Sequence, residues 1–145
     1  MSEALKLTYY ASLAKEEEGY IVTFRDLENI FTEGDTVEEA LFNAQDALDS
    51  VLVEMTKGNQ EIPWPSDAFE GEYPIPVSPE IAAPILLNQL RHKRNQSMTH
   101  VAKAMNIPYQ QYQRLEHDCN MTLKSLKKAV TAMGGRVEIR FYLND

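Results

Sequence analysis

The sequence has little of several residue types on which common kinds of site depend. Cys119 is the one cysteine among 145 residues, so the chain can form no internal disulfide and no zinc site built on cysteines. No apolar run approaches the ~20 residues of a membrane span, and the start Met1-Ser2-Glu3 has no features of a secretory signal. We therefore expect a cytoplasmic protein that makes no membrane contact and holds no metal or cofactor.

Basic residues are also scarce, and they are distributed unevenly. Residues 1–80 contain 4 basic and 18 acidic side chains, a net charge of −14, whereas residues 81–145 contain 10 basic and 4 acidic ones, a net charge of +6. This asymmetry predicts two domains, of which the second binds a polyanion and the first a basic partner. An acidic surface that serves only solubility is the alternative for the first domain.

The first half of the chain has the pattern of three strands and a helix. Apolar residues alternate with mostly polar ones over residues 5–13, and further strands are expected at residues 20–27 and 29–33. Thr36-Val37-Glu38-Glu39 is a capping box. Beyond it, apolar residues recur every three or four positions as far as Met55, which predicts a long helix with one face on the sheet.

A proline-rich stretch separates this helix from the second half. Five of the seven prolines lie between residues 59 and 79, which excludes helix and allows at most an edge strand at Tyr73–Val77. We place the domain boundary directly beyond it, giving domains 1–78 and 79–145. Four helical segments are expected between Ile81 and Met133, with Pro84 kinking or delaying the first of them.

The middle two of these helices have the spacing of a helix-turn-helix. Ser97 is a suitable N-cap for a short helix, and the small Ala102 permits close crossing of a second helix. Asn106 stands where the turn requires a left-handed backbone, for which asparagine is the best substitute for glycine. Pro108 then opens the next helix, whose Tyr112 and Leu115 face inward.

The residues left on the outside of this second helix suit the major groove of DNA. Gln can bond adenine and Arg can bond guanine through two hydrogen bonds each, whereas a solvated helix face more often carries Glu–Lys pairs. Phosphate contacts are expected from Thr99 and Lys103, and also near Lys93 and Arg94, although a solvated charge explains each of these basic residues as well. The predicted base-reading residues are Tyr109, Gln110, Gln111, Gln113 and Arg114.

The end of the chain predicts a further helix and a strand. Helix Thr122–Met133 should direct Leu123, Leu126, Val130 and Met133 inward, and the residues from Arg136 to Leu143 alternate like a strand. Because no other strand is expected in this half, we predict that it pairs with its copy in a second chain and so forms a dimer or higher oligomer. Return of this strand to the first sheet is the alternative.

No arrangement of residues indicates catalysis. Asp26, Glu28, Glu33 and Asp35 lie near predicted strand ends and admit a metal-dependent nuclease as an alternative, but solvated loop acids account for them as well. The polar positions of the first predicted strand include no carboxylate. Neither a catalytic triad nor a Cys–His pair follows from the spacing of the histidines, His92, His100 and His117. We expect a protein that is not an enzyme and has no catalytic residue.

By its motifs the chain resembles the HicB antitoxin family over nearly its whole length. The resemblance rests on Gly19–Phe24, on Thr32–Ala40 at the start of the helix, on Asn43–Leu48 within it, and on Ile62–Ser66 after it. In that family the first half is a partial, catalytically inactive ribonuclease H fold that binds and covers HicA, a small basic mRNA interferase toxin. Members with a helix-turn-helix also repress their own operon, while others carry a ribbon-helix-helix tail that this sequence lacks.

The resemblance thus implies an α+β protein: a ribonuclease H-like βββαβ domain that binds toxin, and an all-α DNA-binding domain that ends in a dimerising strand. Toxin contacts are assigned to Asp26, Glu28, Glu33 and Asp35 from their place at the sheet rim. The expected partners are a HicA-type toxin, double-stranded operator DNA and a second copy of the chain. A transcription regulator whose first domain senses a small molecule is the alternative function.

Overall fold

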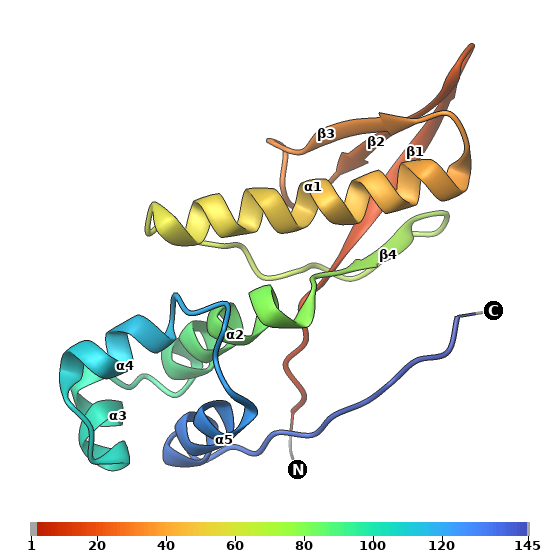
Figure 1. Cartoon of the computed structure of the whole chain (residues 1–145). Helices are drawn as coiled ribbons and strands as arrows, with labels where there is room; N and C mark the ends of the chain where they lie inside the picture. The colour runs from red at the N-terminus through yellow and green to blue at the C-terminus, as the bar shows by residue number, and fades with distance from the viewer. Residues whose placement is uncertain (1–2, 145) are drawn as a thin grey trace. The chain divides into compact units, whose positions relative to one another are not determined.

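A computed structural model of the chain describes residues 3–144 and divides into two compact units (Figure 1). Unit Met1–Ala82, here called the sheet unit, precedes unit Ala83–Asp145, the helical unit. The division falls inside helix α2 (Pro79–Lys93), four residues beyond the boundary placed at residue 78. Each unit is described by itself.

The sheet unit consists of four antiparallel strands and one long helix. The strands β1 (Thr8–Glu16), β2 (Gly19–Phe24), β3 (Phe31–Gly34) and β4 (Tyr73–Pro76) are arranged in the order β3-β2-β1-β4. Helix α1 (Val37–Lys57) lies between β3 and β4 in the chain. This arrangement confirms the predicted α+β fold with its βββαβ order.

The hairpin between β1 and β2 is tighter than the sequence indicated. The predicted strands ended at residue 13 and resumed at residue 20, but β1 runs on to Glu16, which pairs with Gly19. Only Glu17 and Glu18 remain in the turn, and Gly19 adopts φ +100°, a left-handed conformation that favours glycine. Three consecutive glutamates therefore lie at the tip of this hairpin.

Helix α1 covers one face of the sheet, as Figure 1 shows. The capping box is confirmed, since the Thr36 hydroxyl accepts a hydrogen bond from the Glu39 amide at 3.1 Å. Gly34 of β3 is needed for close packing, because a Cβ atom there would lie 2.3 Å from the Ala40 nitrogen. The α1 positions with completely buried side chains are Ala40, Ala44, Leu48 and Leu52.

The helical unit contains the four predicted helices. They are α2, α3 (Met98–Met105), α4 (Tyr109–Leu115) and α5 (Leu123–Ala132). Helix α2 begins at Pro79, ahead of Pro84, so the proline does not delay it. The core of the unit is made by Leu87, Val101, Ala102, Tyr112, Ala129, Val130 and Met133.

One prediction about the end of the chain is wrong. Leu123, expected inside, is 66% exposed because it is the first residue of α5, while Ala129 is completely buried further along the helix. Residues 136–144 form no strand in the single chain, so the predicted strand that pairs with a second copy stays a prediction. A strand needs a paired neighbour for its backbone groups, and a single chain gives this segment none.

A buried ion pair fastens α2 to the end of α4. The Arg91 guanidinium donates to both carboxylate oxygens of Glu116 at 2.7 and 3.1 Å, and Asn88 donates to the same carboxylate at 2.9 Å. The side chains of Arg91 and Glu116 are only 9% and 1% exposed. Burial is the largest single influence and by itself raises the pKa of Glu116, but the hydrogen bonds that the carboxylate accepts and the charge of Arg91 together outweigh it, so the pKa is lowered and the carboxylate stays charged.

We predict that Glu116→Ala lowers the free energy of unfolding by ~3 to 5 kcal/mol, because it leaves the Arg91 charge buried without a partner. Urea denaturation followed by circular dichroism measures this change. The matched control is Glu138→Ala, which breaks the exposed pair with Arg136 and should cost at most ~1 kcal/mol.

Acid provides a second readout for the same pair. A carboxyl group with a lowered pKa stabilises the fold above its ordinary value of 4.5 and loses that contribution as the pH falls through the lowered pKa. The stability difference between the parent chain and Glu116→Ala should therefore shrink below pH 4.5. Equal losses in the Glu116 and Glu138 variants would contradict the role of the buried pair.

Candidate functional site

The two short helices and the left-handed turn that the sequence predicts are present as α3, Asn106 and α4. The Ser97 hydroxyl caps α3 by accepting from the His100 amide at 3.0 Å. Asn106 adopts the left-handed conformation that ends this helix, with φ 58° and ψ 46°. Ala102 is 3% exposed in the core, where a larger side chain would force α3 away from its neighbours. Pro108 stands at the N-cap of α4 with φ −63°.

Helix α4 turns one side to the core and the other to solvent. Tyr112 is completely buried, and Leu115 packs against the same core. Thr99 and Lys103 of α3 are also exposed. All five residues predicted to read bases are exposed, namely Tyr109, Gln110, Gln111, Gln113 and Arg114.

The surface around α3 and α4 lacks negative charge. Residues 81–115 contain no aspartate or glutamate, although they include five lysines and arginines. The next acidic residue, Glu116, is buried against Arg91 and adds no exposed carboxylate. Arg94 donates to the Gly134 carbonyl at 3.1 Å, while Lys103 extends from an exposed position on α3. Helices α3 and α4 are therefore cationic, and α4 adds three exposed glutamines.

The structure separates the four acidic residues assigned to toxin contact into two groups. Asp26 and Glu28 follow β2, whereas Glu33 and Asp35 lie at the opposite end of the β2–β3 pair, where Gly34 pairs with Tyr20. The Asp26 carboxylate is engaged within the unit, because it accepts from the Ser66 amide and hydroxyl at 2.8 Å. Glu28, Glu33 and Asp35 are exposed.

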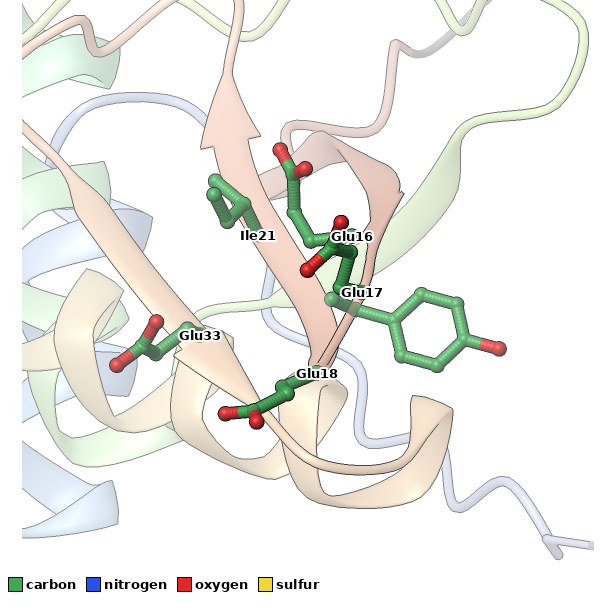
Figure 2. A pocket seen from close by; sticks show the side chains of 6 residues that line it. Glu16, Glu17, Glu18, Ile21 and Glu33 are labelled. Atoms are coloured by element: carbon green, nitrogen blue, oxygen red, sulfur yellow. The ribbon is translucent and has the colours of Figure 1, made fainter.

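Glu33 instead lies near three acidic residues that are not among the predicted toxin contacts. The hairpin tip places Glu16, Glu17 and Glu18 around Ile21, with Glu33 on the neighbouring strand (Figure 2). The pairing of Ile21 with Glu33 in the β2–β3 ladder sets this proximity. The alternation of residues along each strand indicates which side chains share a face of the sheet. Which residues of two neighbouring strands lie opposite each other is fixed only in the folded sheet.

Sequence reasoning also missed the role of Arg25. Its guanidinium donates to both Glu72 oxygens at 2.7 and 3.1 Å, to the Asp67 carbonyl at 2.8 Å, and to the Ser66 hydroxyl. It also lies 4.0 Å from the centre of the Phe69 ring. The hydrogen bond from Arg25 lowers the pKa of Glu72. Arg25 thus holds the proline-rich segment to the end of β2 and serves the structure of the unit.

The described residues give no support to a metal centre or a membrane span. Across residues 3–144, no group of three or more His, Cys, Asp or Glu side chains is placed to hold a metal ion. In the same range, no helix is long and apolar enough to cross a bilayer.

Comparison with known proteins identifies the family of the chain. The family model described as the HicB-like antitoxin of bacterial toxin–antitoxin systems matches residues 8–83. Antitoxin HicB 2 of Photorhabdus laumondii is 31% identical over 92% of this chain and 95% of its own length. Antitoxin HicB of Escherichia coli K12 is 28% identical over 85% of this chain and 90% of its own length. The chain therefore belongs to the HicB-like antitoxin family.

Proposed function

We propose that this protein neutralises a small basic toxin of the HicA type through its sheet unit and represses its own operon through its helical unit. The observation that carries the second half of the proposal is the exposed side of α4, which presents three glutamines and an arginine on a surface without acidic residues. Family membership and the −14 charge of residues 1–80 support the first half.

In this proposal α4 enters the major groove. Gln110, Gln111 and Gln113 can bond adenine edges, and Arg114 can bond guanine through both of its terminal nitrogens. Thr99 and Lys103 of α3 contact phosphates and so set the position of α4 without reading sequence. The buried Arg91–Glu116 pair keeps the end of α4 in place.

We predict that Gln111→Ala and Arg114→Ala each cost ~1 to 3 kcal/mol on DNA from the chain's own promoter and relax its sequence preference. Lys103→Ala should weaken binding to promoter and scrambled DNA alike, because a phosphate contact is the same in both. Fluorescence anisotropy at fixed salt measures these affinities. The matched control is Lys57→Ala, which removes an exposed lysine from α1 and should change neither affinity. Equal losses on both DNAs for all three helical-unit variants would contradict base reading by α4.

Dimerisation is proposed to involve the segment after α5. Its apolar side chains are unusually exposed, with Ile139 at 63%, Phe141 at 92% and Leu143 at 96%. They alternate with Arg136, Glu138 and Arg140, a period that suits a strand once a neighbour supplies backbone partners. The same segment from a second chain is such a neighbour, and paired half-sites in DNA would then match paired helical units.

We predict that deletion of residues 136–145 converts the dimer to a monomer and lowers promoter affinity at least ~10-fold, because two half-sites no longer bind together. Light scattering after gel filtration gives the mass, and anisotropy gives the affinity. A truncated chain that stays dimeric would show that another surface holds the pair.

Neutralisation is proposed to occur by covering the toxin, without chemistry by this chain. An acidic unit complements a protein whose surface is basic because it binds RNA, and charge complementarity speeds their association. The regulator that senses a small molecule differs from this proposal in needing no protein partner.

We predict that a small basic toxin is encoded beside this chain's gene, and that co-expression of this chain restores the growth of cells which that toxin alone arrests. The sheet unit should be required for rescue, while Gln111→Ala and Arg114→Ala should leave it intact. Growth curves with and without induction measure the effect. The sensor alternative would be favoured if the neighbouring protein were harmless or growth failed to recover.

A further inference from the structure

The sheet has a second face whose residues are only partly polar. In the ladder, Ser12 pairs with Thr23, which pairs with Phe31, while Ala14 pairs with Ile21, which pairs with Glu33. Successive side chains alternate between faces, so these six lie opposite the buried row that includes Ala11, Val22 and Phe24 under α1. The open face is defined here by Ser12, Ala14, Ile21, Thr23, Phe31 and Glu33.

The apolar residues of the open face are unusual for a solvated sheet surface. Antiparallel sheets with one wet face ordinarily alternate apolar inside and polar outside. Here Phe31 is 68% exposed, Ala14 is exposed and Ile21 is half-buried. They occupy neighbouring strands and so form a continuous patch, the kind of exposed surface that marks interaction sites. Phe42 on α1, at 73% exposed, has Glu38, Glu39 and Asp46 as its helical neighbours instead.

The two edges of the sheet are poorly suited to accept an added strand. β4 contains Pro74 and Pro76, which have no N–H groups to donate. On β3 the Glu33 carbonyl already accepts from the Asn43 side-chain amide at 2.8 Å. A partner of the sheet is therefore better received on the open face than along an edge.

Charge indicates what kind of partner fits. Glu33 lies on the open face, and Glu16, Glu17 and Glu18 border it at the hairpin tip (Figure 2). Among the described residues, no lysine or arginine forms an ion pair with any of these four glutamates. Lys15 lies on the α1 side, 4.8 Å from the centre of the Tyr20 ring.

We propose that the open face is the docking surface for a basic protein, with Phe31 as its apolar anchor and the hairpin glutamates as its charged rim. This inference rests on the proposed antitoxin function and identifies the occupant as the basic toxin. Phe31 is the one aromatic residue among the six that define the open face, and aromatic residues are enriched among the energetically dominant residues of interfaces. A second copy of the acidic sheet unit would be repelled by the same rim.

The experiment measures binding of the full-length chain to the small basic protein encoded beside its gene, by titration calorimetry. Phe31→Ser should raise Kd ~30-fold or more. The matched control is Phe42→Ser, which removes an equally exposed phenylalanine from α1 and should leave Kd within about twofold. Glu33→Lys should also weaken binding, whereas Asp46→Lys, an exposed charge reversal on α1, should have the smaller effect.

The outcomes separate the two proposals. If the parent chain does not bind the neighbouring protein, the antitoxin function fails and the docking surface fails with it. If the parent binds but the α1 variants lose as much affinity as the open-face variants, only the docking surface is overturned. If Phe31→Ser lowers the mass of the free protein in light scattering, the occupant is a second copy and the inference is wrong. Unchanged melting temperatures show that a lost affinity does not reflect unfolding.

Discussion

The placement of α4 depends on the ion pair between Arg91 and Glu116, and with it the surface proposed to read DNA. Removing two charges from water is costly, so such a pair adds little net stability. Its geometry instead fixes where the end of α4 lies against α2. The pair joins residues of α2 and the end of α4 that lie 25 positions apart in sequence. It also buries the first carboxylate to follow residue 80, which leaves the exposed surface of α3 and α4 cationic.

In the sheet unit, two of the few basic residues make contacts within the unit. Arg25 is engaged with Glu72 and the segment around Ser66, and Lys15 lies over Tyr20. Together with the bond from the Tyr9 hydroxyl to the Pro63 carbonyl, at 2.6 Å, Arg25 attaches the proline-rich segment to the sheet. These basic residues therefore make contacts within the unit. Among the described residues, no lysine or arginine forms an ion pair with the exposed carboxylates at the hairpin tip. In each unit one residue of the minority charge is thus bound within the unit, Arg25 in the sheet unit and Glu116 in the helical unit.

Local patterns in the sequence were enough for the elements but not for the contacts between them. Periodicity predicted α1 and the four helices of the second unit, and the left-handed Asn106 followed from turn chemistry alone. Leu123 was misplaced because a period identifies a face without fixing where the core begins along the helix. Local sequence patterns do not predict the ion pairs Arg25–Glu72 and Arg91–Glu116, because the two residues of each pair are 47 and 25 positions apart. Likewise, the gathering of Glu33 with the hairpin glutamates depends on strand register.

The net charge of −8 combines an acidic first unit with a basic second unit. These opposite charges affect which partner each unit can bind. In the proposed function, an acidic sheet unit repels DNA, so the phosphate backbone would select the helical unit and leave the other free. The exposed cations around α4 would likewise repel a basic protein partner and direct it to the sheet unit. Discrimination between partners needs unfavourable pairings as well as favourable ones, and opposite charges on two units of one chain supply both. If the surfaces of both units carried mixed charges, similar contacts could form, but either partner could then bind to either unit.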